Sequence, residues 1–381
     1  MHICFITDEY PVPGKPHGGI GTFVYALAHG LSGSGVQVTV AGHGDADREY
    51  KDGPVTVHHV RPSKWPLAKF VDFYGRLNKR LLQIHKQQPI DVIEGAELTF
   101  AWLPKIKGIK YVIRLHGGHN FFTKLLKIPT SNWRSFQEKR AFKKADHFVA
   151  VTQFVLDGTR VYLPIPENKA TKIFYPVDCN KFYQADVAKM VPFKIVFAGT
   201  VTEKKGVRQL VMAMPAIIEK FPNTTLDIYG RDWVMPDGTS FIESLQPYIG
   251  DSLKNAISFK GPVLHESLPA IYESAHLCAF PSHMETQGIV VLETMSMGKA
   301  VLFSTKGPGP ETIEHLKDGL IADPYSPEDI AEKILHLFSH PGLELQLGSN
   351  ARKKMLEKYS LPVVTKLNKE FYEGITGKAG G

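Results

Sequence analysis

Two glutamates stand in one short stretch of the chain, at a spacing that suits the two ends of an extended ligand. The stretch covers residues 281–301, with Glu285 ahead of an apolar run and Glu293 inside it, and a helix is expected to start near Gly288. On a helix, eight residues span roughly 12 Å, which is too far for two carboxylates to share one proton. The residues alone leave two interpretations open: both glutamates contact a ligand, or Glu285 caps the helix and Glu293 is solvated.

A glycine-rich turn at residues 17–21 lies between the first expected strand and the first expected helix. Because glycine has no Cβ, backbone N–H groups and a helix N-terminus can approach an anion there. The spacing is not the G-x-G-x-x-G of dinucleotide-binding folds, so an oxidoreductase of that class is disfavoured. An ordinary turn explains these glycines equally well.

The elements that must position these residues alternate between short apolar runs and amphipathic stretches. Helix-like segments include residues 23–32, 70–87 and 133–144. Such alternation predicts parallel sheets with helices on both faces. Because it occurs in each half of the chain, it predicts two doubly wound domains, with ligands bound at the carboxyl ends of the strands. Strands are expected at residues 2–7, 36–41, 55–60, 91–94, 110–115 and 147–151, and again at 194–198, 225–229, 257–260, 276–280, 300–304 and 319–321.

The composition is that of an ordinary soluble globular protein. Of the 381 residues, 43% are hydrophobic and 22% are charged, which excludes a disordered or fibrous chain. The sequence contains no apolar run of about 18 residues, the length needed to span a membrane. We expect that the first residues are not a signal peptide. The three cysteines, Cys4, Cys179 and Cys278, are far apart, so we expect no disulfide scaffold or cysteine zinc site and a location in the reducing cytoplasm.

Positive charge is concentrated in the first half of the chain. Residues 1–180 contain 24 basic and 15 acidic residues, whereas residues 181–381 contain 21 and 23. Segment 105–144 alone has eleven basic residues, a single acidic one (Glu138) and interleaved apolar residues such as Trp133 and Phe136. Such a segment can lie on an anionic membrane surface, and the alternative is a solvated basic face over an ordinary amphipathic helix. Nothing resembles a nucleic-acid recognition module, so no nucleic-acid partner is expected.

The string 281–301 resembles the E-x7-E signature of retaining GT-B glycosyltransferases of family 4, although Ala300 stands where that family usually has proline. The likeness runs over nearly the whole chain and implies the GT-B architecture: two Rossmann-like doubly wound parallel-sheet domains facing across a cleft. It implies an acceptor-side domain at 1–180, a nucleotide-sugar-binding domain at 190–360, and a helix at 361–376 that crosses back to the first domain. Other segments that resemble family motifs are the glycines at 18–21, the strand end at 113–117, the turn at 175–178, and residues 307–311 and 318–321.

The resemblance also assigns roles to individual residues. Glu285 would contact the transferred sugar, His116 would lie beside that sugar, and Lys205 would stabilise the leaving diphosphate. Glu293 would hold the ribose hydroxyls, as a carboxylate can accept two hydrogen bonds. The remaining donor-binding residues would act through their backbone groups and are Gly18, Gly19, Gln287, Gly288 and Ile289.

One departure from the family concerns the phosphate clamp. Thr200 stands where the family has arginine, and a threonine donates one hydrogen bond and carries no charge. Lys204 and Arg231 are the candidates to supply the missing positive charge.

The implied activity is transfer of a sugar from a nucleoside diphosphate sugar to an acceptor hydroxyl with retention, without a metal or any cofactor beyond this co-substrate. His116 and His119 lie three residues apart in the sequence, but no carboxylate or cysteine accompanies them at the spacing of a metal site, so no metal site is expected. The expected acceptor is a glycan, lipid-linked or otherwise anionic, in cell-envelope or polysaccharide biosynthesis, which would place the protein at the inner face of the membrane. Two alternatives stay open: a nucleotide-sugar epimerase of similar architecture, and a catalytically weak nucleotide-sugar-binding partner protein.

Overall fold

The computed structural model describes residues 1–12, 18–61 and 69–378, and the chain forms two compact units. Unit 1 combines residues 1–176 with the residues from Leu361 onward, and unit 2 consists of residues 177–360. The first boundary falls inside the 175–178 turn. The chain therefore leaves unit 1, completes unit 2 and returns to unit 1 with its final helix.

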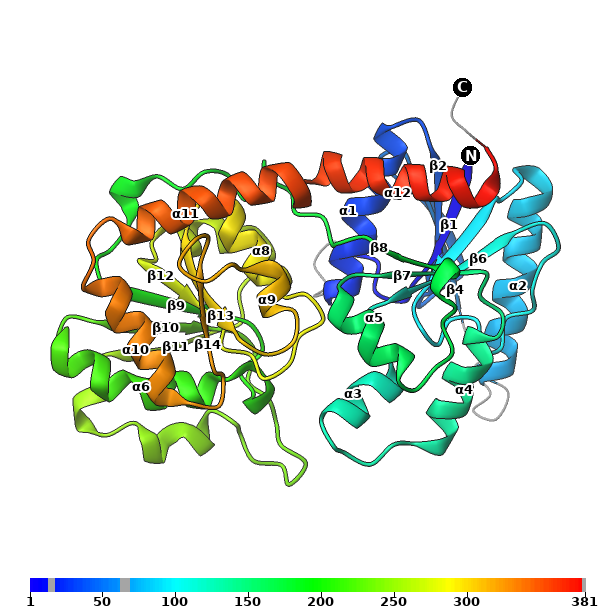
Figure 1. Cartoon of the computed structure of the whole chain (residues 1–381). Helices are drawn as coiled ribbons and strands as arrows, with labels where there is room; N and C mark the ends of the chain where they lie inside the picture. Colours follow the sequence, from blue (N-terminus) through cyan, green and yellow to red (C-terminus); the bar gives the residue numbers. More distant parts are fainter. Residues whose placement is uncertain (13–17, 62–68, 379–381) are drawn as a thin grey trace. The chain divides into compact units, whose positions relative to one another are not determined.

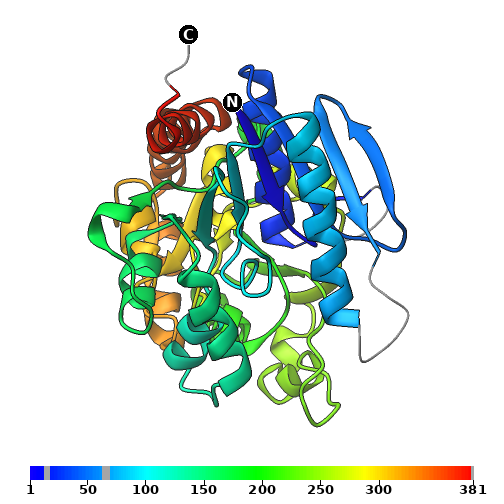
Figure 2. The same cartoon turned by 90° about the vertical axis from the view of Figure 1, so that its right-hand side faces the viewer.

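Unit 1 is built on an eight-stranded sheet in the order β3-β4-β2-β1-β5-β6-β7-β8. Every neighbouring pair is parallel except β3 and β4, which form an antiparallel hairpin at one edge (Figure 2). The hairpin strand β3 was not expected, because its residues are mostly charged and form no apolar run. The strands are β1 (His2–Ile6), β2 (Gln37–His43), β3 (Arg48–Asp52), β4 (Val55–Val60), β5 (Val92–Gly95), β6 (Lys110–Leu115), β7 (His147–Ala150) and β8 (Ala170–Lys172).

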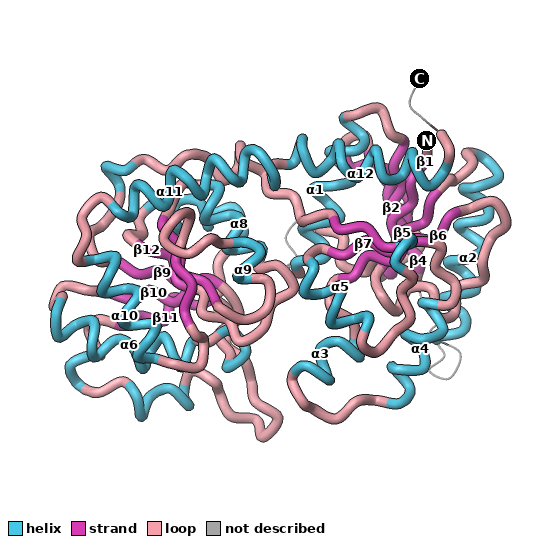
Figure 3. Tube along the Cα trace, in the orientation of Figure 1, coloured by secondary structure: helices cyan, strands magenta, loops and turns pink. Residues whose placement is uncertain are grey.

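Helices pack against this sheet, with the strands forming a central layer (Figure 3). Helix α1 shows the reason: Phe23, Leu27 and Leu31 recur every four residues and are all buried, which places one apolar stripe against the sheet. The helices of unit 1 are α1 (Gly19–Gly33), α2 (Lys69–Gln87), α3 (His119–Leu125), α4 (Asn132–Phe142), α5 (Gln153–Arg160) and α12 (Leu361–Thr376).

Unit 2 contains a six-stranded sheet in the order β11-β10-β9-β12-β13-β14, in which every pair is parallel. The prediction of two doubly wound, Rossmann-like domains is thereby confirmed. The strands are β9 (Lys194–Ala198), β10 (Thr225–Tyr229), β11 (Ile257–Gly261), β12 (Leu277–Ala279), β13 (Ala300–Ser304) and β14 (Leu320–Ala322). The helices are α6 (Val207–Lys220), α7 (Leu268–Glu273), α8 (Ile289–Ser296), α9 (Gly309–Thr312), α10 (Pro327–Phe338) and α11 (Leu343–Lys354). In the described parts of both units, no helix has the length and apolar character needed to cross a bilayer.

The final helix, α12, packs against α1 and is joined to the sheet of unit 1 by a buried polar network (Figure 1). Arg114 on β6 is wholly buried, and its Nε donates a hydrogen bond of 2.6 Å to Oε1 of Glu94 on β5. Its Nη2 donates to Oδ1 of Asn368 at 2.6 Å, and the Tyr372 hydroxyl donates to Oε2 of Glu94 at 2.7 Å. A buried charge needs such partners, because removing an ion from water without them costs on the order of several kcal/mol.

We expect the substitution Glu94→Gln to destabilise unit 1 by about 3–5 kcal/mol, because the Arg114 guanidinium would stay buried without its anion. Denaturant unfolding of the full chain measures the change. The matched control is Glu314→Gln, which removes an ion pair with Lys317 on the surface and should leave the stability unchanged. Equal stability of Glu94→Gln and the control would contradict the role given to the buried pair.

Candidate functional site

The strand order of unit 2 reverses between β9 and β12, which is where doubly wound sheets bind their ligands. The loop after β9 contains a short 3-10 turn over Glu203–Lys205 that ends at Gly206, with φ of 70°. A Cβ atom on Gly206 would collide with the carbonyl oxygen of Pro281 in the loop after β12. Glycine is therefore required both by the left-handed backbone and by the close approach of the two loops.

An ion pair joins these two loops. Nζ of Lys205 contacts Oε1 of Glu285, and the Ser282 hydroxyl donates to the same oxygen at 3.3 Å. Both charged side chains keep part of their surface exposed, 26% for Lys205 and 13% for Glu285. The structure thus brings together two of the three predicted catalytic residues, at a position open to a charged ligand.

Lys204 belongs to the same cluster. Its carbonyl oxygen accepts a hydrogen bond of 2.9 Å from the backbone N–H of His283, in the loop that carries Glu285. Burial lowers the pKa of Lys204, and the charge of Lys205 lowers it further, while Glu285 acts in the opposite direction. Two lysines and one carboxylate therefore interact at this edge of the sheet.

Thr200 and Arg231 lie on neighbouring strand ends. The N–H of Val201 donates to the carbonyl oxygen of Arg231 at 2.9 Å, and a Cβ on Gly230 would collide with the carbonyl oxygen of Gly199. The backbones after β9 and β10 are thus in contact beside Thr200. The Arg231 side chain is exposed, and its role at a ligand remains a prediction.

Helix α8 begins directly after this loop. Gly288 precedes it with φ of 80°, and no side chain among the described residues caps the helix. The N–H of Val291 already donates to the carbonyl oxygen of Gly288 at 3.0 Å, so the N–H groups of Ile289 and Val290 are the candidates to bind an anion. Gln287 and Gly288 are buried, and Ile289 is half-buried. Glu285 lies in the loop ahead of the helix, so the helical spacing considered for the two glutamates does not describe this pair.

Glu293 is only 2% exposed, and the interpretation of a solvated residue is wrong for it. Its Oε1 is hydrogen-bonded to Nε2 of His265 at 2.6 Å, and Nδ1 of His265 lies 2.8 Å from Nζ of Lys181. Its Oε2 is also buried and accepts no hydrogen bond from any residue in the described ranges. Sequence reasoning missed His265 and Lys181; the one available signal was that His265 follows β11 at the same edge of the sheet.

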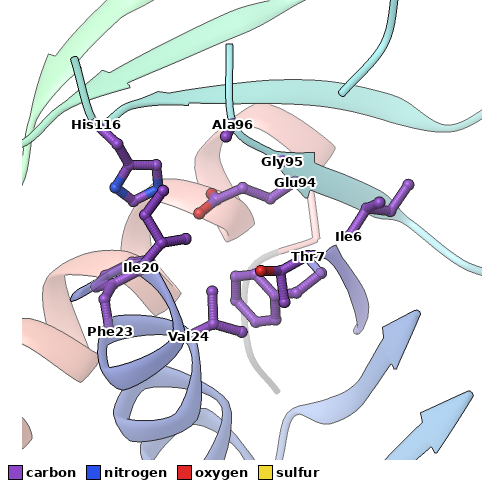
Figure 4. Close-up of a pocket in the computed structure, with 10 residues that line it drawn as sticks. Ile6, Thr7, Ile20, Phe23, Val24, Glu94, Gly95, Ala96 and His116 are labelled. Carbon is purple, nitrogen blue, oxygen red and sulfur yellow. The ribbon is translucent and has the colours of Figure 1, made fainter. Parts of the chain in front are cut away.

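Unit 1 has a pocket at its own switch point, between β1 and β5. In Figure 4 the carboxylate of Glu94 and the ring of His116 both face the beginning of α1. The pocket is small and otherwise mostly apolar, and both oxygens of Glu94 already accept hydrogen bonds from Arg114 or Tyr372. Its lining residues are Phe5, Ile6, Thr7, Ile20, Phe23, Val24, Glu94, Gly95, Ala96 and His116.

His116 is held in place from two sides. Its Nδ1 lies 2.5 Å from the Tyr175 hydroxyl, and its ring packs edge-on against Phe23 of α1. Burial lowers the pKa of His116 to about 3, and the nearby charge of Arg114 acts in the same direction. The imidazole is therefore neutral at neutral pH and serves as a hydrogen-bonding group.

The predicted glycine turn lies at the start of α1. Gly18 precedes the helix, Gly19 is its first residue, and both are exposed, whereas His17 lies outside the described residues. A Cβ on Gly21 would collide with the carbonyl oxygen of Glu9, so this glycine has a packing role. No side chain among the described residues caps the first N–H groups of α1, so their role at an anion stays a prediction.

Two buried glutamates behind the His116 loop were also missed from the sequence. Burial raises the pKa of Glu97 to about 8, with the charge of Glu138 as an additional cause. Glu138 accepts the backbone N–H of Asn120 at 2.9 Å, and a Cβ on Gly118 would collide with its carboxylate. The carboxylate of Glu138 therefore holds the start of α3.

Across the described ranges, no three His, Cys, Asp or Glu side chains are arranged to hold a metal ion.

The basic segment 105–144 divides into buried and exposed parts. Arg114 belongs to the buried network and Lys105 pairs with Asp146, so neither contributes to an open basic face. The remaining surface, the α3–α4 face, combines exposed cationic and apolar side chains, and Trp133 stacks on Trp102 with 5.5 Å between ring centroids. Its members are Lys124, Leu125, Leu126, Lys127, Ile128, Trp133, Arg134, Phe136, Lys139 and Lys143.

Family models match both halves of the chain. Residues 17–181 match the family model Glycosyltransferase Family 4, and residues 181–354 match Glycosyl transferases group 1. An uncharacterized glycosyltransferase of Methanocaldococcus jannaschii is 27% identical over 98% of both chains.

Solved structures show the same fold. Sucrose-phosphate synthase from Thermosynechococcus elongatus superimposes with a TM-score of 0.83 at 20% identity, over 99% of this chain and all of that one. The Anabaena protein HepE in complex with UDP-glucose gives a TM-score of 0.77 at 18% identity, over 98% of this chain and all of that one. With a glycosyltransferase family model on each half and a GT-B structural match along its length, the chain belongs to the GT-B glycosyltransferases of the family 4 type.

Proposed function

We propose that this glycosyltransferase moves a sugar from a nucleoside diphosphate sugar to an acceptor hydroxyl with retention at the anomeric carbon. The observation that carries the proposal is the contact between Lys205 and Glu285 at the switch point of unit 2. A cation and a carboxylate at one place match a donor that has a diphosphate at one end and sugar hydroxyls at the other. The complex of HepE with UDP-glucose supports a donor of this class.

Donor binding would exchange the partners of this ion pair. The diphosphate would take over Lys205, because a phosphate offers several anionic oxygens to an ammonium group. Glu285 would then be released to accept hydrogen bonds from the sugar hydroxyls. The uncapped N–H groups at the start of α8 and the glycines 18 and 19 at the start of α1 are proposed as further anion contacts.

Lys204 is our candidate for the charge that Thr200 does not provide. Burial lowers its pKa, and the charge of Lys205 acts in the same direction against the opposite effect of Glu285. The negative charge of a bound diphosphate would favour its ammonium form. His116, as a neutral imidazole, is proposed to hydrogen-bond a sugar hydroxyl.

The proposed step is a displacement on one face of the sugar. The bond from the anomeric carbon to the phosphate oxygen breaks, and the new bond to the acceptor oxygen forms on the same side. The acceptor's proton passes to the departing phosphate. Lys204, Lys205 and backbone N–H groups would stabilise the negative charge on the leaving diphosphate, so the proposed reaction needs no metal ion.

The α3–α4 face supports an acceptor at an anionic membrane, such as a lipid-linked glycan of cell-envelope or polysaccharide biosynthesis. It combines exposed cationic side chains with Trp133 and Phe136, which are 55% and 49% exposed. Glu138, the only acidic residue of segment 105–144, is buried and does not reduce the positive charge at the surface. Cationic side chains would meet the anionic headgroups while the aromatic rings enter the interface.

The substitution Lys205→Ala should lower kcat about 10²–10³-fold and change KM much less, because the charge on the diphosphate grows in the transition state. Release of the nucleoside diphosphate, measured with and without acceptor, provides the rates and separates transfer from epimerisation. Lys254→Ala, which removes an exposed lysine of the same unit, is the control. A kcat equal to that of the control would assign the charge stabilisation to another residue.

Sedimentation with vesicles tests the membrane contact. The protein should bind vesicles that contain anionic lipid, and binding should weaken as salt rises. Replacing Lys124 and Lys127 together by Gln should weaken it roughly tenfold or more, at about 1 kcal/mol per lysine. Trp133→Ala should weaken binding as well, whereas Trp233→Ala, at an exposed tryptophan of unit 2, should not. Equal binding to neutral and anionic vesicles at low salt would favour a soluble acceptor.

A further inference from the structure

We propose that Lys181 and His265 are positioning residues for Glu293: they fix one oxygen of its carboxylate and leave the other to accept a hydrogen bond from a ribose hydroxyl of the nucleotide. The inference rests on the proposed donor site and adds two residues to it. Neither residue belongs to the E-x7-E stretch, and neither is expected to touch the nucleotide itself.

The direction of each hydrogen bond follows from the groups involved. A lysine ammonium group can only donate, so Nδ1 of His265, 2.8 Å from Nζ of Lys181, must accept. A neutral imidazole that accepts at Nδ1 carries its proton on Nε2. That proton is donated to Oε1 of Glu293 at 2.6 Å. Lys181 thus selects the tautomer of His265 that can hold Glu293.

The second oxygen of Glu293 provides the independent observation. Oε2 is buried and accepts no hydrogen bond from the residues that the structure describes. Buried carboxylate oxygens are normally hydrogen-bonded, and an exception calls for an explanation such as a missing ligand. A ribose hydroxyl can donate the missing hydrogen bond. Because Oε1 is already hydrogen-bonded to His265, the carboxylate of Glu293 presents Oε2 to the ribose in a single orientation.

The turn at the start of unit 2 sets the position of Lys181. Oδ1 of Asp178 accepts the backbone N–H groups of Asn180 and Lys181 at 2.9 and 3.2 Å. The carbonyl oxygen of the next residue, Phe182, accepts a hydrogen bond of 2.9 Å from the hydroxyl of Ser296, on the same helix as Glu293. The turn that resembles a family motif is therefore connected to α8, which gives Asp178 a physical role.

Aromatic packing restricts the ring of His265. The Phe182 ring lies 5.5 Å from it between centroids, and Phe182 also packs against the fully buried Tyr272. Rotation of the imidazole would disturb this packing and break both of its hydrogen bonds. The hydrogen bond to Glu293 is thus fixed before any nucleotide arrives.

The test compares a nucleoside diphosphate with its 2′,3′-dideoxy analogue, using whichever of UDP, GDP and ADP binds the wild-type protein most tightly. We expect calorimetry to show at least a tenfold preference of the wild type for the ribose form. Glu293→Gln should reduce the preference to less than twofold, and His265→Ala should do the same while leaving the affinity for the dideoxy analogue unchanged. His265→Gln, which can still donate to Glu293, should restore most of the preference, and Lys181→Met should weaken it.

The exposed His340, replaced by alanine, is the matched control in the same unit and should leave the preference unchanged. If the wild type shows no preference, or binds none of the three nucleotides, the proposed donor site itself is wrong and this inference falls with it. If Glu293→Gln abolishes the preference but His265→Ala retains it, only the positioning role is wrong.

A second measurement needs no nucleotide. Nitrogen NMR of the histidine rings should show His265 with its proton on Nε2, and Lys181→Met should produce a mixture of tautomers. An unchanged tautomer in Lys181→Met would overturn the role of Lys181.

Discussion

Parallel pairing of neighbouring strands is the constraint on which both candidate sites depend. In a parallel sheet all carboxyl ends meet at one edge, and at the strand where the order reverses the loops diverge and leave room for a ligand. In unit 2 this geometry brings Lys205, after β9, to Glu285, after β12, although 80 residues separate them. In unit 1 it forms the pocket between β1 and β5.

Each unit contains a buried carboxylate whose position is fixed by hydrogen bonds, Glu94 in unit 1 and Glu293 in unit 2, and the two differ in their partners. Both oxygens of Glu94 accept hydrogen bonds within unit 1, from Arg114 and from the Tyr372 hydroxyl, while Nη1 of Arg114 has no hydrogen-bond partner among the described residues. Glu293 is held by one imidazole hydrogen bond and keeps a second oxygen without a partner in the described structure. The first arrangement stabilises a fold, since every acceptor is used. The second leaves unused hydrogen-bonding capacity, which is the property of a binding group.

Much of the fold could be predicted from the sequence because buried parallel strands are continuous apolar runs, as in β13, where all five residues are buried. Strand β3 could not, since an edge hairpin needs no apolar run. The contact of Lys205 with Glu285 follows from the strand order, but the sequence does not reveal that order. The alternative of a solvated Glu293 is wrong because α8 is apolar almost all round, a pattern typical of a buried helix, in which a polar residue is also buried. The contacts from Lys181 through His265 to Glu293 depend on side-chain positions in two separate loops, so the spacing of these residues in the sequence does not predict them.

The assignment of α12 to unit 1 has a consequence for the order in which the protein matures. Domains of a growing chain generally fold as units, starting from the N-terminus during synthesis. Here unit 2 is complete at residue 360, whereas Asn368 and Tyr372, the helix partners of Arg114 and Glu94, are synthesised only after it. The second unit in the sequence can therefore close first on the ribosome. Until α12 emerges, Arg114 and Glu94 of unit 1 lack the hydrogen bonds that Asn368 and Tyr372 provide, so unit 1 reaches its final form last.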